Sequence, residues 1–280
     1  MTSPRSPFLL LAPAMAIFTA VFALPVAYFF IVSFWRKDSF NLVPDLTLSN
    51  YAVVFSEYAR PLFFTFAMAT IVAAITTALA FCMAYVIRFK AGRYSLVLLF
   101  VVLITLFGGY LAKIYVWKTI LGQTGILNTG LLLLGLIETP IKVFLFNPIA
   151  VVIALSHYLL PLAVLPIYGS LRAIEDSPLQ CARDLGAGPG RCFRDIVLPQ
   201  CGTGLLVAFA LSFLFVAGDW VTPKLIGGPY TSMIGTFIEY QYGSRFNQPL
   251  GAAMAFTVIV ICVLIIGCVA LAGRALLRPR

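Results

Sequence analysis

Long apolar runs alternate with short polar stretches along the 280-residue chain. A helix needs about 20 predominantly apolar residues to cross the hydrocarbon core of a bilayer. The pattern therefore predicts an all-α membrane protein in which residues 1–280 form a single transmembrane domain. Runs of sufficient length predict six membrane-spanning helices, which are Phe8–Phe34, Leu62–Ile87, Tyr94–Val116, Ala150–Leu171, Thr203–Val221 and Gly251–Ala272.

Length also decides how two unusual runs are interpreted. The first run follows Arg5 and stays uncharged from Ser6 to Trp35, which is longer than the apolar core of about 7–15 residues in a signal peptide. We interpret it as a retained first transmembrane helix. The stretch Gly125–Ile137 (GILNTGLLLLGLI) is shorter than a span, so we predict an interfacial or re-entrant segment there.

The composition agrees with a membrane protein and argues against a soluble one. Hydrophobic residues make up 61% of the chain and charged residues 10%, whereas soluble domains carry about 25% charged residues. The net charge of +9 is best explained by Lys and Arg in cytoplasmic loops, so we expect no nucleic-acid partner. The six cysteines include no CxxC pair, and we expect no metal site.

The basic residues orient the predicted helices in the membrane. The C-terminal stretch RALLRPR is the strongest single indication of the cytoplasmic side, and no cysteine falls in a predicted outer loop, where thiols meet an oxidising compartment. We therefore predict that both termini are cytoplasmic. With that orientation, eleven of the 19 basic residues lie on the cytoplasmic side, namely Arg5, Arg88, Lys90, Arg93, Arg172, Arg183, Arg191, Arg194, Arg274, Arg278 and Arg280.

A polar stretch, CARDLGAGPGRCFRDIVLP, lies between the fourth and fifth predicted spans, in a cytoplasmic loop of residues 172–200. Ser177 and Gln180 have the spacing of a capping box, which predicts a helix over Pro178–Leu185. Gly186 suits the end of that helix. Gly188 and Pro189 then predict a turn into a second short helix.

The predicted pair of helices offers a surface to a partner. The first helix places Leu179, Ala182 and Leu185 on one side, as a knob that suits a groove on a cytosolic protein. The alternative is a solvated loop that folds on itself. The chain contains neither GxxxxGKS nor GxxxxGKT, the motifs of a phosphate-binding loop, so energy from ATP has to come from a partner.

Asp219 is the acidic residue that the pattern places at a span, near the outer end of the fifth. Acidic groups in spans are costly and often functional, so Asp219 either meets a cationic substrate or gates its entry. The alternative is an interface residue that faces water or pairs with a loop lysine such as Lys224. Nearby aromatic rings either face an ammonium group or only anchor the helices at the interface. His157 is expected to form a hydrogen bond between helices. The candidate substrate pathway comprises Asp219, Trp220, Tyr110, Tyr115 and Trp117.

Several motifs resemble those of one transporter family. Gly186 is followed by nine residues and then Ile196, Val197, Leu198 and Pro199, which resembles the cytoplasmic signature EAA-x3-G-x9-I-x-L-P of ABC-importer permeases. Gln180 and Cys181 replace its Glu and first Ala, while Ala182 agrees. The segments that resemble the spermidine/putrescine-type permeases within that family are Gly108–Asn128, Gly218–Pro229 and Gln248–Phe256.

This resemblance implies a type I ABC-importer permease fold in a bacterial inner membrane. It implies a second, similar permease subunit, two cytosolic ATPase subunits that bind ATP-Mg, and an extracytoplasmic solute-binding protein. The chain itself would bind no cofactor and would move a small organic solute, a polyamine or a related cation, by alternating access. The residues that would couple transport to the ATPase are Gln180, Ala182, Arg183, Asp184, Leu185, Gly186 and Ala187.

Two other classes of membrane protein compete with this interpretation. A secondary transporter of small organic cations normally needs ionisable residues at mid-span and inverted repeats, and the sequence shows neither pattern. An intramembrane enzyme needs catalytic motifs such as HExxH or GxSxG, which are absent from the sequence. The chain is therefore expected to be a transport subunit and not an enzyme.

Overall fold

The computed structural model describes residues 7–39 and 41–276. The chain divides into two compact units, Met1–Arg60 with Phe237–Ile259, and Pro61–Thr236 with Val260–Arg280. The expectation of a single permease domain stays a prediction. Three of the basic residues used for orientation, Arg5, Arg278 and Arg280, lie outside the described residues.

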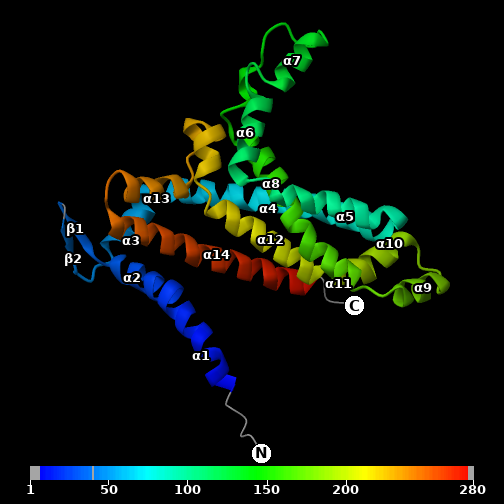
Figure 1. Ribbon diagram of the computed structural model, residues 1–280, viewed down its shortest axis with the longest axis horizontal. Coiled ribbons are helices and arrows are strands. Elements are labelled where there is room, and N and C mark those ends of the chain that lie inside the picture. The colour runs from blue at the N-terminus through cyan, green and yellow to red at the C-terminus, as the bar shows by residue number, and fades with distance from the viewer. Residues whose placement is uncertain (1–6, 40, 277–280) are drawn as a thin grey trace, which may run out of the picture. The chain divides into compact units, whose positions relative to one another are not determined.

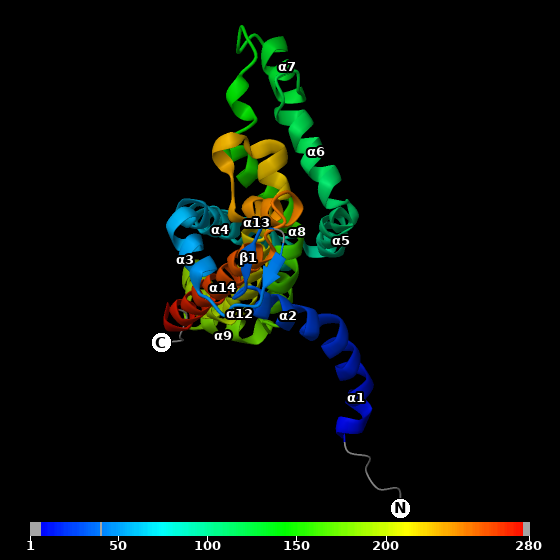
Figure 2. The same ribbon diagram turned by 90° about the vertical axis from the view of Figure 1, so that its left-hand side faces the viewer.

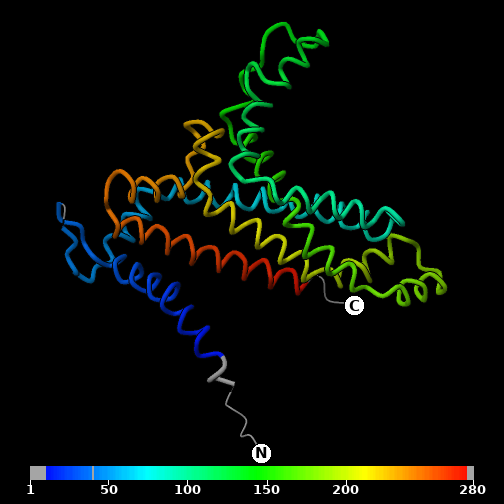
Figure 3. The backbone as a smooth tube through the Cα atoms, in the orientation of Figure 1, coloured from blue at the N-terminus to red at the C-terminus, as the bar shows by residue number. Residues whose placement is uncertain are grey.

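Among the described residues, four helical stretches are long and apolar enough to cross a membrane, and two bent helix pairs raise the number to six if each pair is one span. The long stretches are Leu11–Val32, Ala59–Phe89 (α4), Pro148–Arg172 (α8) and Gln248–Ala275. The last lies in α14 (Gln248–Leu276), which Figure 3 traces as one unbroken coil. The prediction of an all-α membrane protein with about six spans is confirmed.

The third predicted span, Tyr94–Val116, is wrong as a continuous helix. Helix α5 (Ser95–Ile104) passes into a 3-10 turn, η3 (Thr105–Phe107), and the chain then bends by 96° before α6 (Tyr110–Leu121). Gly108 in extended conformation and Gly109 in a non-helical one form the break. Glycine loses more conformational freedom in a helix than any other residue, which favours an interruption at this position. Figures 1 and 2 show α6 and α7 (Ile126–Leu133) leading away from α5.

The predicted interfacial stretch Gly125–Ile137 contains α7, a helix of 8 residues that follows α6. Asn128 in α7 is buried, and its amide donates to the carbonyls of Gly122 and Ile141 over 3.0 Å each. The Asn128 amide oxygen also accepts from the Ile141 backbone N–H over 2.8 Å. These bonds connect the turn after α6 to the loop before α8. The stretch is therefore a short helix held in place by its own hydrogen bonds.

The remaining spans keep their predicted places with shifted ends. The first is interrupted, since α1 (Pro7–Phe18) and α2 (Leu24–Val32) are joined by a π-helical turn, η1 (Thr19–Ala23). The fifth, α12 (Gly202–Ala217), ends four residues before the predicted Val221, because Gly218 leaves the helix ahead of the buried Asp219. The pair Pro189–Gln200 and Gly202–Ala217 is bent by 61°.

The first unit holds a two-stranded antiparallel hairpin, β1 (Arg36–Asp38) with β2 (Asn41–Val43), and helix α3 (Ser49–Glu57). Asn50 in α3 donates to the carbonyls of Ser33 and Trp35 over 2.9 and 2.8 Å, which holds the end of α2 against α3. Phe30 packs edge-on against Phe256 in α14, with 5.0 Å between ring centroids. Only 6% of the first span is buried inside the chain.

The second unit is organised around α8 and α12, which lie side by side (Figure 1). Small residues let their backbones approach, as is common between membrane helices. A Cβ atom added at Gly204 of α12 would lie 2.5 Å from the Ser170 hydroxyl and 2.6 Å from the Pro166 carbonyl of α8. Helix α4 joins this core, where Ala80 and Ala84 are fully buried.

Short elements connect the long helices of the chain. The helix α13 (Ile234–Gly243) precedes α14, and three short helices, α9 (Asp176–Asp184), α10 (Pro189–Cys192) and α11 (Leu198–Gln200), lie between α8 and α12. The remaining 3-10 and π-helical turns are η2 (Gly92–Tyr94), η4 (Lys142–Phe144), η5 (Phe193–Val197), η6 (Pro223–Gly227) and η7 (Pro229–Thr231).

Candidate functional site

The first candidate site is the loop of residues 172–200, and its helix α9 begins earlier than the sequence predicts. The predicted start was Pro178, but the helix begins at Asp176, with Glu175 in extended conformation at the capping position. No side chain caps this end, so the predicted capping box of Ser177 and Gln180 is wrong. Asp176 in the first turn stabilises the start of the helix instead, because its carboxylate interacts with the positive end of the helix dipole.

Arg88 ties the start of α9 to the end of α4. Its guanidinium donates to the Asp176 carboxylate over 2.9 Å and to the Ile174 carbonyl over 3.3 Å. The Arg88 side chain is 24% exposed and the Asp176 side chain is 65% exposed. Water therefore screens this ion pair mainly at the Asp176 carboxylate. Sequence reasoning missed this link because the two residues are 88 positions apart and carry no shared local pattern.

The predicted helix end at Gly186 is confirmed. Gly186 has a φ of +83°, a left-handed conformation that glycine adopts without the clash of a Cβ atom. Its backbone N–H donates to the Arg183 carbonyl over 2.8 Å, and the N–H of Ala187 donates to the Ala182 carbonyl over 2.9 Å. This pair of bonds is the Schellman motif, which satisfies the free carbonyls of the last helical turn.

The prediction that Leu179, Ala182 and Leu185 share one face toward a partner is wrong. Leu179 is buried in the core of the second unit, and Ala182 packs partly buried against the same core. Leu185, in contrast, is 88% exposed. The helix therefore uses one face to attach to the membrane domain, and its free surface is formed by Gln180, Arg183, Asp184, Leu185 and Gly186.

The second half of the loop is also anchored to α4. Helix α10 begins at Pro189 with Gly188 at the capping position, as predicted. Phe193 in η5 then packs edge-on against Phe81 and Tyr85 of α4, with centroid distances of 5.8 and 5.9 Å. Together with the Arg88 ion pair, this contact fastens the loop to one continuous helix at two points.

The second candidate site is a buried cluster around Asp219, which is 6% exposed. One carboxylate oxygen, Oδ1, accepts from the Tyr110 hydroxyl over 2.6 Å and from the Val221 backbone N–H over 3.0 Å. The Tyr110 hydroxyl lies 2.6 Å from the Thr222 hydroxyl, which completes a chain of three side chains. The other oxygen, Oδ2, is buried with no hydrogen-bond partner among residues 7–39 and 41–276. The cluster thus holds an acceptor with unused capacity.

Aromatic rings and one amine enclose this cluster. The Tyr110 ring lies 5.0 Å from that of Tyr158 and 5.5 Å from that of Phe215, measured between centroids. The Lys113 ammonium lies 5.2 Å from the centroid of the Tyr158 ring, an attractive cation–π geometry. Sequence reasoning singled out Tyr110 and Asp219 but missed Thr222 and Lys113. The Asp219–Thr222 spacing of three residues was the available local signal.

In the described part of the chain, none of the other predicted pathway residues forms a hydrogen bond with the Asp219 side chain. Tyr115 is 53% exposed and Trp220 is 38% exposed. Trp117 packs edge-on against His157, with 5.7 Å between centroids. The Lys224 ammonium, weighed as a partner for Asp219, lies 5.1 Å from the centroid of the Trp220 ring. The structure therefore joins Asp219 to Tyr110 and leaves the other three aromatic residues apart from it.

Comparison with known proteins identifies the family. Residues 94–280 match the family described as "Binding-protein-dependent transport system inner membrane component". The chain belongs to this family. It is 31% identical over 237 residues to the spermidine/putrescine transport system permease protein PotB of Haemophilus influenzae, which covers 84% of this chain and 82% of that protein. This membership favours an ATP-driven importer subunit over a secondary transporter or an enzyme.

Solved structures agree on the fold. A bacterial ABC transporter that imports the acidic polysaccharide alginate superimposes with a TM-score of 0.77 at 14% identity, covering 96% of this chain and 94% of that chain. The same kind of transporter in complex with an alginate-bound periplasmic protein gives a TM-score of 0.74 at 13% identity, covering 97% and 94%. At this identity the likeness shows the fold, which is that of a type I ABC-importer permease.

Proposed function

We propose that the chain is the permease subunit of an importer for polyamines or related organic cations. In this assembly it pairs with a second permease and two ATPase subunits that bind ATP-Mg, and an external binding protein delivers the solute. The 172–200 loop and both termini then face the cytoplasm, in agreement with the basic residues. The observation that carries the proposal is the exposed surface of α9 in a loop whose opposite side is attached to α4. The attachment consists of the Arg88–Asp176 ion pair and the packing of Phe193 against Phe81 and Tyr85.

The loop has the construction that a mechanical link requires. Its outer surface, formed by Gln180, Arg183, Asp184, Leu185 and Gly186, is exposed and can meet an ATPase subunit. Leu179 and Phe193 face the membrane domain. Arg88 adds an ion pair at the start of α9. A displacement imposed on Leu185 is therefore transmitted to α4 through packed side chains and not through a flexible connection.

The cluster around Asp219 supports a cationic solute. A carboxylate inside a membrane domain is costly unless it is used, and its Oδ2 atom has no hydrogen-bond partner among the described residues. The rings of Tyr110 and Phe215 beside it suit an alkylammonium chain, since aromatic faces attract cations, while the Tyr158 ring already holds the Lys113 ammonium. The PotB relative is a spermidine/putrescine permease by name, which agrees with this chemistry.

The test of the coupling surface is the ATPase activity of the assembled transporter in proteoliposomes, stimulated by binding protein loaded with spermidine. Leu185→Ala removes an exposed side chain, so folding is little affected, but we expect at least about fivefold weaker stimulation if it is an interface hot spot. Leu96→Ala is the matched control, because Leu96 in α5 is 80% exposed and lies outside the loop. Equal stimulation of both variants contradicts the coupling role.

The test of the solute is uptake of radiolabelled spermidine by the same vesicles. Asp219→Asn keeps the shape and the hydrogen bond to Tyr110 but removes the charge, so we expect a KM at least about tenfold higher, as for the loss of one buried charged contact. Stimulation by the loaded binding protein should persist. Unchanged uptake by Asp219→Asn places the solute elsewhere, and absent uptake by the wild type rejects polyamines.

A further inference from the structure

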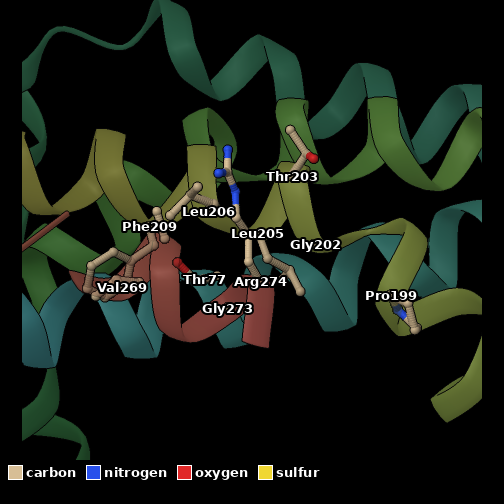
Figure 4. Close-up of a pocket in the computed structure, with 11 residues that line it drawn as sticks. Thr77, Pro199, Gly202, Thr203, Leu205, Leu206, Phe209, Val269, Gly273 and Arg274 are labelled. Atoms are coloured by element: carbon tan, nitrogen blue, oxygen red, sulfur yellow. The ribbon is translucent and has the colours of Figure 1, made fainter. Parts of the chain in front are cut away.

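A groove opens within the second unit between α4, α12 and the end of α14 (Figure 4). Its volume is about 640 Å³, inside the range of about 300–1,000 Å³ that is usual for ligand pockets. The walls are mostly apolar, and the groove lies at the end of α12 that continues into the 172–200 loop. The lining residues that matter here are Thr77, Thr203, Leu206, Phe209, Val269 and Arg274.

Three polar side chains interrupt the apolar walls. Arg274 is exposed and makes no hydrogen bond or ion pair within the described ranges, and Figure 4 shows its guanidinium extending from α14 toward α12. The Thr77 hydroxyl is buried and has no hydrogen-bond partner there either, and Thr77 is 9% exposed. Thr203 adds an exposed hydroxyl on α12. The groove thus combines one positive charge with an unsatisfied buried hydroxyl.

Charge and size exclude two kinds of occupant. A polyamine is repelled by Arg274, so the groove is not a path for the proposed solute. A helix about 10 Å wide would fill 640 Å³ within about 8 Å, or roughly one and a half turns, so the groove cannot enclose a whole partner helix.

A single acyl chain fits these dimensions better. The eight residues from Gly202 to Phe209 rise by about 10 Å along α12. That distance is about two thirds of the hydrocarbon depth of one leaflet, which is about 15 Å. The wall is therefore long enough to hold the part of one acyl chain that is nearest the headgroup. Arg274 lines the same groove and can contact that headgroup.

We propose that this groove binds one anionic phospholipid, with the phosphate on Arg274 and an acyl chain along Leu206, Phe209 and Val269. The Thr77 hydroxyl then has an ester carbonyl to which it donates. Basic pockets between membrane helices at the cytoplasmic face are known to hold acidic headgroups, because that leaflet is negatively charged. The inference goes beyond transport itself, since it assigns a lipid site that the solute does not use.

The experiment is native mass spectrometry of the full-length protein purified with its bound subunits. The detergent-solubilised complex is titrated with phosphatidylglycerol or with phosphatidylcholine of the same acyl chains. The wild type should retain one phosphatidylglycerol with at least about fivefold higher affinity than phosphatidylcholine, the value expected for one basic contact. Arg274→Gln should abolish that preference.

A second variant tests the acyl chain independently of the charge. A Cβ atom at Gly273 meets no atom within 4 Å, so Gly273→Leu fills the groove without strain and should reduce the binding of both lipids. The matched controls are Gly267→Leu, which is equally open but lies outside the groove, and Arg93→Gln, an exposed basic residue elsewhere. Both should bind phosphatidylglycerol like the wild type.

The other outcomes overturn the proposal. Equal affinity of the wild type for both lipids, or an unchanged preference in Arg274→Gln, removes the headgroup site. Full lipid binding by Gly273→Leu removes the groove as the place of the chain. Displacement of phosphatidylglycerol by spermidine would assign the groove to the solute, and a cross-link from Phe209→Cys to a partner subunit would assign it to a protein. Lipid retention is measured without transport, so it is independent of the proposed function.

Discussion

Gly186 holds a backbone conformation that a side chain opposes. The φ of +83° lies in the left-handed region, where an L-residue with a Cβ atom loses about 1–2 kcal/mol. A Cβ atom at this position meets nothing within 4 Å, so the cost is conformational and not steric crowding by neighbours. The left-handed step after α9 therefore favours glycine at this position.

Replacing Gly186 by alanine should lower the free energy of unfolding by about 1–2 kcal/mol, measured by titration with a denaturing detergent. Gly190→Ala is the control, because Gly190 lies in α10, has no positive φ and has open space at its Cβ position. Alanine favours a helix by about 0.5–1 kcal/mol over glycine, so that variant should be neutral or more stable. Equal effects of the two substitutions would contradict the Schellman turn.

At the scale of elements, the start of α9 is held to α4 through Arg88, which forms an ion pair with Asp176 and also donates to the Ile174 carbonyl. Arg88→Gln and Asp176→Asn should each lower the free energy of unfolding. The double variant should lose less free energy than the sum of the two single losses. We expect a coupling free energy of about 0.2–1 kcal/mol from the double-mutant cycle, since Asp176 is largely exposed and the pair is screened by water.

The pair Arg36 and Asp45 provides the comparison for that cycle. Its atoms are 3.9 Å apart and both side chains are more than half exposed, so its coupling should be close to zero. The readout that separates attachment from simple stability is the number of solute molecules transported per ATP hydrolysed. A ratio that stays at the wild-type value in Arg88→Gln would show that α4 receives no force through this residue.

Helices α8 and α12 approach closely at one point, and the approach depends on Gly204. Gly204→Ala would place a methyl group 2.5 Å from the Ser170 hydroxyl and 2.6 Å from the Pro166 carbonyl. Crowding of this kind costs about 1–3 kcal/mol, which thermal unfolding in detergent should reveal as a lower Tm. Adding Ser170→Ala should not restore stability, because the carbonyl of Pro166 remains.

Gly169→Ala is the matched substitution for Gly204→Ala. Gly169 lies in α8, and a Cβ atom there meets nothing within 4 Å. The gain in helix propensity should raise the stability by about 0.5–1 kcal/mol. The changes in stability of the two alanine variants are thus expected to have opposite signs. A Gly204→Ala protein as stable as the wild type would contradict the close approach of α8 and α12.

For the whole molecule, the sequence predicts the number of spans better than their shape. Length and apolarity suffice for α4, α8 and α14, because a bilayer imposes both. They do not locate the bend at Gly108 and Gly109, since the residues on either side are equally apolar. In the sequence, the two adjacent glycines are the only sign of the break. The mean hydropathy of the whole run does not reveal it.

The candidate site shows the same division between local and distant information. The spacing from Gly186 to Pro199 and the end of α9 were predictable, because they depend on neighbouring residues. The inward direction of Leu179 and the contact of Arg88 with Asp176 were not, since a helix of 9 residues can rotate to bury either face. Asp219 was predictable as an acidic residue at the end of a span, whereas its burial and its hydrogen bond with Tyr110, which joins positions 109 residues apart, were not.

The orientation of the whole chain can be tested with one of its own cysteines. Cys181 is exposed on α9, while Cys192, Cys201 and Cys262 are buried. Cys82 and Cys268 are exposed but lie within the membrane-spanning helices α4 and α14. Maleimides react with the thiolate, which forms in water and not in hydrocarbon, so Cys181 should dominate the labelling of the native protein.

A membrane-impermeant maleimide should therefore label inverted membrane vesicles strongly and intact spheroplasts weakly, if the loop of residues 172–200 faces the cytoplasm. Cys181→Ser should remove most of the signal in vesicles, whereas Cys268→Ser should leave it nearly unchanged. Strong labelling of spheroplasts that disappears in Cys181→Ser would place α9 outside. The exposed surface around Leu185 could then no longer meet a cytosolic ATPase, and the basic residues would have predicted the wrong orientation.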